Sequence, residues 1–257
     1  MPELLEAEIY RRAAERCVGR VCARVHVPDP SYVRGGLSAS LLGRRLRGRT
    51  IHGVDRLGKV VTLDLAGVGL ALRFGMTGRL LVDGVGPIDR LEYGPAGDRW
   101  VRFELRLVDG GSLAIVDPRR LGSVELEPDL SGLGPDAARL TLGQLRTAVA
   151  GAHAPLKARL LDQARIAGLG NLLTDEILWR AGLDPARPAG GLSEVETVQL
   201  HRTIRSTLRQ LDGRGGSHTG DLQEFRSLDA PCPRCGDPLL RRTIGGRTTY
   251  SCRTHQV

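Results

Sequence analysis

Four residues near the end of the chain have types and spacing that suit a metal ion. Cys232 and Cys235 are separated by two residues, a gap of sixteen residues leads to Cys252, and His255 follows after two more. Each short knuckle offers two ligands from one tight turn, and three thiolates with one imidazole suit a tetrahedral Zn²⁺ site. The sequence therefore predicts one structural zinc ion.

The residues between the two knuckles predict a β-hairpin. Runs 239–244 and 248–251 can pair as strands around Gly245-Gly246. His255 lies two residues from the end of the chain, so it is either the fourth ligand or a tail residue outside the site. We expect it to be the ligand, which makes this segment a zinc ribbon.

A glycine-rich turn at residues 168–171 is a second candidate site. Gly168 and Gly170 allow a close backbone approach, and Asn171 is expected to cap the helix that follows. The N-terminus of a helix presents free N–H groups to an anion, so the pattern favours phosphate binding. An ordinary helical hairpin would also account for it.

The pair Pro2-Glu3 places a possible nucleophile at the start of the chain. Removal of Met1 before the small residue Pro2 leaves a secondary amine. An α-amino group titrates near 8, below a lysine, and a helix N-terminus lowers its pKa further. Such an amine can act as a nucleophile at neutral pH. Alternatively, the proline simply begins a helix.

Lysine is rare in this chain. Only Lys59 and Lys157 are lysines among 37 basic residues, and the rest are arginines. A lysine retained against that bias is expected where a compact ammonium is needed and a planar guanidinium does not fit.

Composition narrows the class of protein. The 257 residues are 41% hydrophobic and carry a net charge of +8. No apolar run reaches the roughly 18 residues of a membrane helix, and the acidic N-terminus is unlike a signal peptide. We expect an intracellular protein whose other cysteines, Cys17 and Cys22, are buried thiols. The charge favours nucleic acid as partner, although a solvated arginine-rich surface would also explain it.

The elements that must position these residues follow from local patterns. Residues 3–18 predict a helix ended by Gly19. Short β-rich runs separated by glycines follow to about residue 127 and predict a sandwich or barrel. A linker is expected at 131–135. Helical signals then include the capping boxes Thr141-x-x-Gln144 and Ser193-x-x-Glu196. The expected runs are strands at 21–27, 60–65, 70–74, 100–107, 113–116 and 124–126, and helices ending near 151, 165, 180 and 211.

These features together resemble the bacterial formamidopyrimidine-DNA glycosylase and endonuclease VIII family. Members typically begin MPELPEVE, and this chain begins MPELLEAE. The family's DPRRFG and LGMSG are similar to DPRRLG at 117–122 and FGMTG at 74–78. Its GxGNIYxxExL and HLGPEP are similar to GLGNLLTDEIL at 168–178 and GLGPD at 132–136. The resemblance runs from residue 1 to the zinc ribbon.

The resemblance implies an α+β fold in three domains. Residues 1–130 would form a catalytic domain with an N-terminal helix and a β-sandwich. Residues 137–227 would form a helix–two-turn–helix DNA-binding domain, and 228–257 the zinc ribbon. The protein would be a bacterial, cytoplasmic, nucleoid-associated monomer that binds damaged double-stranded DNA.

The resemblance also implies a catalytic centre for base excision. Pro2 would be the nucleophile, Glu3 the catalytic carboxylate and Glu6 a supporting residue. Lys59 would contact a phosphate beside the lesion. The activity would be that of a bifunctional DNA glycosylase and AP lyase, which removes a damaged base through a Pro2 imine and cleaves the strand by β,δ-elimination.

Further residues match family positions that hold the DNA. The resemblance implies phosphate contacts by Lys157, Asn171 and Arg247. Met76 and Arg119 match residues that fill the space left by a flipped nucleotide. The third such position, often aromatic in the family, is Leu121 here.

One departure bears on the substrate. Phe225 and Cys232 are joined by only six residues, where the family usually has some twenty or more, including a loop that caps the lesion. A missing cap leaves a more open pocket, which favours ring-opened, oxidised or bulkier lesions over selectivity for 8-oxoguanine.

Two other functional classes compete with this interpretation. A catalytically silent damage-binding protein on the same scaffold is the alternative, but the retained Pro2, Glu3 and Lys59 favour the enzyme. A zinc-ribbon transcription or RNA-binding factor would leave the N-terminal pair unexplained.

Overall fold

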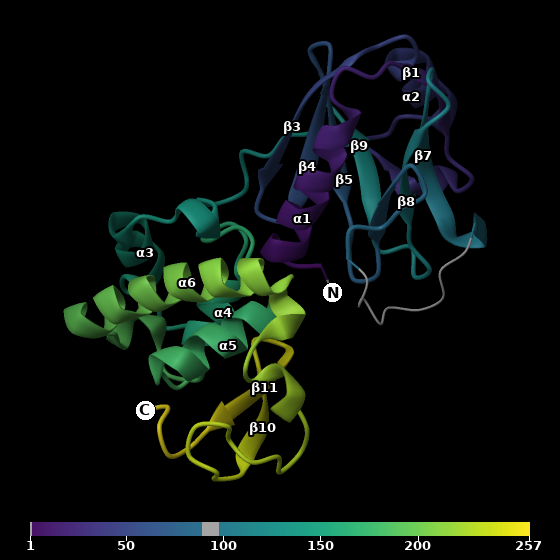
Figure 1. Cartoon of the computed structure of the whole chain (residues 1–257). Coiled ribbons are helices and arrows are strands. Elements are labelled where there is room, and N and C mark those ends of the chain that lie inside the picture. Colours follow the sequence, from purple (N-terminus) through teal and green to yellow (C-terminus); the bar gives the residue numbers. More distant parts are fainter. Residues whose placement is uncertain (1, 89–97) are drawn as a thin grey trace. The chain divides into compact units, whose positions relative to one another are not determined.

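The computed structural model describes residues 2–88 and 98–257, and they form two compact units. One unit contains Pro2 and Glu6–Leu130, and the other contains Glu3–Leu5 and Ser131–Val257. The first is built on β-sheets, and the second on helices with a C-terminal hairpin (Figure 1). The predicted α+β class is confirmed.

Within its described residues, the first unit has two sheets. One has the order β2-β9-β5-β4-β3 and the other the order β1-β7-β8-β6. Helix α1 (Leu4–Ala14) precedes the strands, and α2 (Ala39–Leu46) lies between β2 and β3 in the chain. The strands are β1 (Cys22–His26), β2 (Val33–Arg34), β3 (Ile51–Leu57), β4 (Val60–Leu65), β5 (Val68–Arg73), β6 (Arg79–Val82), β7 (Val101–Leu107), β8 (Ser112–Val116) and β9 (Ser123–Leu126).

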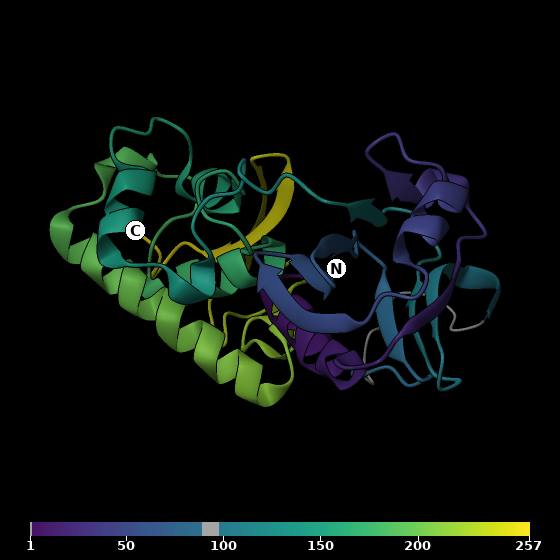
Figure 2. The same cartoon turned by 90° about the horizontal axis from the view of Figure 1, so that it is seen from above.

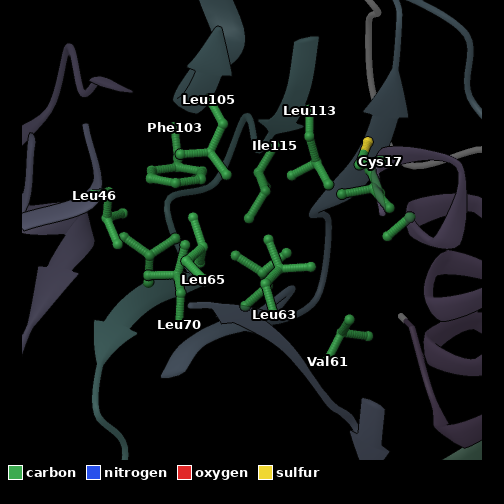
Figure 3. Packing of buried hydrophobic residues seen from close by; sticks show 14 of the residues in the cluster. Cys17, Leu46, Val61, Leu63, Leu65, Leu70, Phe103, Leu105, Leu113 and Ile115 are labelled. Carbon is green, nitrogen blue, oxygen red and sulfur yellow. The ribbon is translucent and has the colours of Figure 1, made fainter. Parts of the chain in front are cut away.

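Apolar side chains from both sheets form the core of this unit. Leu63 and Leu70 come from one sheet, and Phe103 and Ile115 from the other; all four are fully buried. Their side chains point toward one another in Figure 3. Each such side chain contributes about 1.5–3 kcal/mol when it leaves water. The predicted sandwich is confirmed, and Cys17 is a buried core thiol as expected.

The second unit contains α3 (Leu142–Val149), α4 (Leu156–Leu161), α5 (Asn171–Ala181) and α6 (Glu194–Arg214). Both predicted capping boxes are present, at Thr141 for α3 and at Ser193 for α6. Helix α6 spans 21 residues and is the long helix in Figure 2. Gly182 ends α5 in the left-handed conformation, with φ +73°, which glycine adopts at little cost.

The same unit ends in the predicted hairpin of β10 (Leu239–Ile244) and β11 (Arg247–Cys252). Ile244 pairs with Arg247 across Gly245 and Gly246, whose φ angles are +58° and +71°. Positive φ at both turn residues is the requirement of a type I′ turn, which glycine meets without strain.

Three helices differ from the sequence expectation. Helix α1 ends at Ala14 rather than at residue 18. Helix α2 lies where only strands were expected, and α4 ends at Leu161 rather than near residue 165. The cap of α2 was a usable signal, because the Ser38 hydroxyl accepts a hydrogen bond from the N–H of Leu41 (3.2 Å). In the part of the chain that the structure describes, no helix has the length and apolar character needed to cross a membrane.

Candidate functional site

The carboxylate of Glu3 occupies the N-terminal end of helix α5. Glu3 is fully buried, and its two oxygens accept hydrogen bonds from the N–H groups of Leu172 (2.8 Å) and Leu173 (3.0 Å). The first N–H groups of a helix have no partner within the helix, and the helix dipole favours negative charge there. A residue at the start of the chain therefore caps a helix that lies far along the sequence.

The expected capping role of Asn171 is wrong. Gly170 is the N-cap residue of α5, and Asn171 is the first residue inside the helix. The reason is that Glu3 already accepts the hydrogen bonds that an N-cap side chain would take. The Oδ1 atom of Asn171 is buried and has no hydrogen-bond partner among the described residues, so this amide still has an open bonding position.

The glycine turn before α5 admits the start of the chain. The N–H of Leu4 donates to the Gly168 carbonyl (3.1 Å). A Cβ atom on Gly170 would lie 2.2 Å from the Glu3 Cδ atom, and one on Gly168 would lie 2.4 Å from a Leu4 methyl carbon. The close approach that the sequence assigned to a phosphate is made here by Glu3 itself.

We expect Gly170→Ala to lower the free energy of unfolding by about 2 kcal/mol, because the new methyl group displaces a buried carboxylate from its two N–H donors. Urea denaturation measures the effect. Gly213→Ala is the matched control, since a Cβ atom added there, within α6, would meet no described atom within 4 Å apart from its chain neighbours and the backbone of its own helix. That variant should be neutral or stabilised by up to about 1 kcal/mol. Equal urea midpoints for both variants would contradict the tight approach of Glu3.

Pro2 and Glu6 are also buried. Pro2 is bonded directly to Glu3, so its amine lies one residue from the capping carboxylate. Glu6 is in the first turn of α1. Met1, whose removal the sequence predicts, lies outside the described residues.

Lys59 lies in the two-residue turn between β3 and β4. Gly58 has φ +58° at the first turn position, as a type II′ turn requires. Arg56 holds this turn by donating to the Gly58 carbonyl (2.9 Å) and to the Glu8 carboxylate (2.8 Å). Lys59 therefore lies at the end of a hairpin whose turn is held in place by hydrogen bonds from Arg56.

Asp117 organises the loop that carries two of the predicted wedge residues. Its carboxylate is fully buried and accepts hydrogen bonds from the Thr77 hydroxyl (2.5 Å), the Gly122 N–H (2.8 Å) and the Tyr32 hydroxyl (3.3 Å). Burial and the nearby carboxylate raise the pKa of Tyr32, so its hydroxyl stays a donor. Asp117 is the first residue of the DPRRLG motif, and the sequence alone predicted no role for it.

The three predicted wedge residues lie on two loops that touch. A Cβ atom on Gly75 would lie 2.4 Å from the Leu121 backbone, so the turn containing Met76 packs directly on the loop containing Arg119 and Leu121. Arg119 and Leu121 are exposed, and Leu121 keeps 47% of its surface accessible. An exposed apolar side chain beside an arginine suits insertion into a base stack.

Lys157 is placed differently from the sequence expectation. Its side chain is fully buried, and its Nζ atom lies 2.7 Å from the Asp175 carboxylate, 2.8 Å from the Thr249 hydroxyl and 3.0 Å from the Thr248 carbonyl. Burial lowers the pKa of Lys157, and the Asp175 carboxylate opposes that change. An ammonium has three donors, and three oxygens already surround this one, so the structure offers no direct phosphate contact at Lys157.

Arg247, in contrast, is exposed at the first residue of β11. It directly follows the Gly245-Gly246 turn, so its guanidinium is carried by the end of the hairpin. The structure thus separates two cations that the sequence had assigned the same role.

Cys232, Cys235, Cys252 and His255 form one cluster, and their ligand atoms all lie within 4.8 Å of one another. The Cys232 Sγ atom is 3.7 Å from His255 Nδ1, and the Cys235 and Cys252 sulfurs are 3.4 Å apart. Ligand atoms around a tetrahedral zinc ion with bonds of about 2.0–2.3 Å are separated by about 3.3–3.8 Å. The cluster therefore has the dimensions and donor set of a metal site.

Trp179 contacts this cluster, a role that was not predicted from the sequence. Its indole N–H donates to the Cys232 sulfur (3.4 Å), and its ring packs edge-on against His255. Burial opposes ionisation of Cys232, but hydrogen bonds from Trp179 and the backbone lower the pKa of this thiol. A donor aimed at a thiolate is typical of the shell around metal ligands.

Two models of known protein families match this chain and show which family it is related to. The model of the formamidopyrimidine-DNA glycosylase N-terminal domain matches residues 1–124, and that of the H2TH domain of the same enzyme matches residues 132–220. The chain belongs to the formamidopyrimidine-DNA glycosylase family. A formamidopyrimidine-DNA glycosylase of Moorella thermoacetica is 37% identical over 268 residues, which cover 94% of each chain.

Solved structures of the glycosylase from Lactococcus lactis are also similar. A complex with FAPY-dG containing DNA has a TM-score of 0.84 and 25% identity, with 99% of each chain covered. A complex with abasic-site DNA has the same TM-score, identity and coverage. The alignment with the Moorella glycosylase, 268 positions, is longer than this chain of 257 residues, so that relative contains residues which this family member lacks.

Proposed function

We propose that this chain is a DNA glycosylase that excises oxidised and ring-opened bases from double-stranded DNA and then cleaves the strand as an AP lyase. The observation that carries the proposal is the buried Glu3 carboxylate at the N-terminus of α5, directly after Pro2, in a chain of this family. The complexes of the Lactococcus lactis enzyme with FAPY-dG and abasic-site DNA support the substrate class.

The proposed chemistry begins at the Pro2 amine. Its lone pair attacks the anomeric carbon of the damaged nucleotide, and the bond to the base breaks with its electrons leaving on the base. Because Pro2 is a secondary amine, opening of the sugar ring gives an iminium that carries a fixed positive charge. This electron sink favours loss of the sugar α-proton, elimination of the 3′ phosphate and then of the 5′ phosphate.

Glu3 moves protons in this scheme. Opening of the sugar requires a proton at the ring oxygen. The Glu3 carboxylate can take the proton that the Pro2 nitrogen loses on attack and deliver it to that oxygen. The N–H groups of Leu172 and Leu173 hold the carboxylate in one orientation. We assign Glu6, buried in the next turn of the chain, a supporting role.

The remaining site residues hold and distort the DNA in this proposal. Lys59, Asn171 and Arg247 would bind phosphates, which makes binding depend on salt. Extrusion of a base leaves a gap in the stack, and side chains must fill it. The residues assigned to that gap are Met76, Arg119 and Leu121.

We propose zinc as the metal of the Cys/His cluster, one ion per chain. The residues that would hold it are Cys232, Cys235, Cys252 and His255, whose donor set and spacing match tetrahedral zinc. The ion's contribution would be to fix the two knuckles and the hairpin between them, and with them Arg247.

A single-turnover assay tests the proposed activity. Duplexes that contain a ring-opened purine are incubated with excess enzyme, and base release and strand cleavage are measured separately. We expect free base together with products that carry phosphate at both ends of the gap. Base release without cleavage of abasic-site DNA would remove the lyase assignment. Tight binding without either product would indicate a damage-binding protein.

The short linker between Phe225 and Cys232, residues 226–231, predicts the lesion preference; this linker is called the join below. Arg226, at its start, is held by Asp175, and Leu228 keeps 69% of its surface exposed, so these residues form no packed cover of their own. Each polar contact to a flipped base that a cap would have made is worth about 1–3 kcal/mol. We expect ring-opened purines, oxidised pyrimidines or bulkier adducts to be excised faster than 8-oxoguanine.

Single-turnover excision of 8-oxoguanine opposite cytosine, compared with these other lesions, measures this preference. Cleavage of abasic sites is the control, because Pro2 and Glu3 act on the sugar and should be unaffected. Fastest removal of 8-oxoguanine, with strong selectivity over the others, would show that the short join does not open the pocket.

A further inference from the structure

A buried ion pair lies between α4, α5 and the hairpin of the second unit. Lys157 and Asp175 both have side-chain exposures of 0%, and their charged groups are 2.7 Å apart. Burial of two charges is costly unless each is well paired and hydrogen-bonded. The role of this pair is not explained by base excision at Pro2.

The Asp175 carboxylate also binds the two segments that flank the metal cluster. Its second oxygen accepts hydrogen bonds from the Arg226 guanidinium (2.6 Å) and from the Tyr250 N–H (3.3 Å) on β11. Arg226 is the first residue of the segment that leads to the cluster. Arg226 further lies over the Tyr250 ring, 5.1 Å from its centroid. One carboxylate therefore ties α5 to the join and to the hairpin.

A continuous set of contacts leads from Asp175 to Arg247. Lys157 Nζ, paired with Asp175, donates to the Thr249 hydroxyl (2.8 Å), and that hydroxyl donates to the Arg247 carbonyl (3.1 Å). The hairpin turn also packs on the neighbouring residue of α4, because a Cβ atom on Gly245 would lie 2.9 Å from the Ala158 Cβ atom. The Thr249 hydroxyl and the packing of the turn on α4 thus hold the backbone of Arg247 in place, while its side chain is exposed.

We propose that Asp175 is a positioning residue for Arg247, acting through Lys157 and Thr249. The arginine would bind phosphate, and the buried pair would keep its backbone in one place, so that less conformational freedom is lost on binding. This inference rests on the proposed function, since it concerns how the hairpin meets DNA. It also replaces the direct phosphate contact that the family resemblance implied for Lys157.

The sign of the effect at Asp175 distinguishes positioning from simple electrostatics. Asp175→Asn removes a negative charge from a DNA-binding protein, which on charge alone strengthens binding. If the carboxylate positions Arg247, the same change weakens binding. We expect about a 10-fold loss of affinity for a duplex with a tetrahydrofuran abasic-site analogue, close to the loss caused by Arg247→Ala.

A double-mutant cycle tests the link between the two residues. In the Arg247→Ala background, Asp175→Asn should change affinity by less than about two-fold, because the positioned group is already absent. Lys157→Met should behave like Asp175→Asn, and each variant should lower the salt slope by about 0.9, the value for one lost phosphate contact. Additive losses, or an affinity gain in Asp175→Asn, would overturn the proposal.

Arg242→Gln is the matched control on the same hairpin. Arg242 pairs with Asp184 and bonds Ser251, and neither contact leads to Arg247. This variant should retain the salt slope of the wild-type protein, and its affinity for DNA should change by less than about two-fold. Thermal unfolding and zinc content of every variant are measured in parallel, so that a variant that fails to fold is recognised and replaced by Lys157→Met.

A readout without DNA separates this inference from the proposed function. Trypsin cleaves after arginine, so the rate of cleavage at the Arg247–Thr248 bond reports how firmly the hairpin end is held. We expect about a 10-fold faster cleavage there in Asp175→Asn than in wild type or Arg242→Gln. An unchanged rate would overturn the positioning role even if the protein binds DNA. A faster rate in a protein that binds no DNA would instead overturn the proposed function.

Discussion

Glu3→Gln is expected to lower base excision by at least about 1,000-fold, the upper part of the range for loss of a general acid–base group. The amide cannot deliver a proton to the sugar. It also has one acceptor oxygen in place of two, so one of the N–H groups of Leu172 and Leu173 loses its partner. Single-turnover base release measures the effect. Binding to abasic-site DNA should persist, and full excision activity would remove Glu3 from the mechanism.

Covalent trapping tests the partner of Glu3 in the same reaction. Borohydride reduces an imine, so wild-type protein should become cross-linked to abasic-site DNA at Pro2. Mass spectrometry of the digested cross-link identifies the residue. A cross-link at Lys59 would overturn the assignment of Pro2. Trapping at Lys157 is not expected, because that ammonium is buried between three oxygens.

Loss of a metal ligand is expected to have the second largest effect, a loss of bound zinc and of affinity for damaged DNA. Cys252→Ser should reduce bound zinc from one equivalent to less than about a tenth, and affinity for damaged duplex should fall about 100-fold. The physical reason is that Cys252 ends β11, the strand that begins with Arg247, so the cluster and the hairpin are ordered together. Metal analysis after gentle purification and DNA titration measure the two effects.

Cys22→Ala is the matched control for that variant. Cys22 is a buried thiol of the first unit, outside the cluster, so its loss should leave zinc content unchanged. His255→Ala tests the fourth ligand and should also lose zinc. Wild-type protein with less than about half an equivalent of zinc would contradict the site. Full zinc affinity in His255→Ala would assign the fourth position to another group.

Local patterns in the sequence determined much of the fold. Strand β4 and strand β10 occupy the predicted ranges, because alternation and bounding glycines are properties of a few adjacent residues. Both capping boxes formed as predicted for the same reason, since the two partners are three residues apart. The Cys/His spacing predicted the cluster because each knuckle is a local turn. Helix α2 was missed because its apolar signal is only two buried leucines long.

The tertiary structure decided how these elements present charged groups. Glu3 caps α5 across 169 positions of sequence, and Lys157 bonds Thr249 across 92. No local pattern relates such partners, and a buried polar group takes whichever partner the packing brings to it. The sequence therefore identified Glu3 and Lys157 as important residues. Only the fold placed Glu3 at the N-terminus of a helix and Lys157 against the hairpin. Burial there requires that the Lys157 ammonium be paired with Asp175.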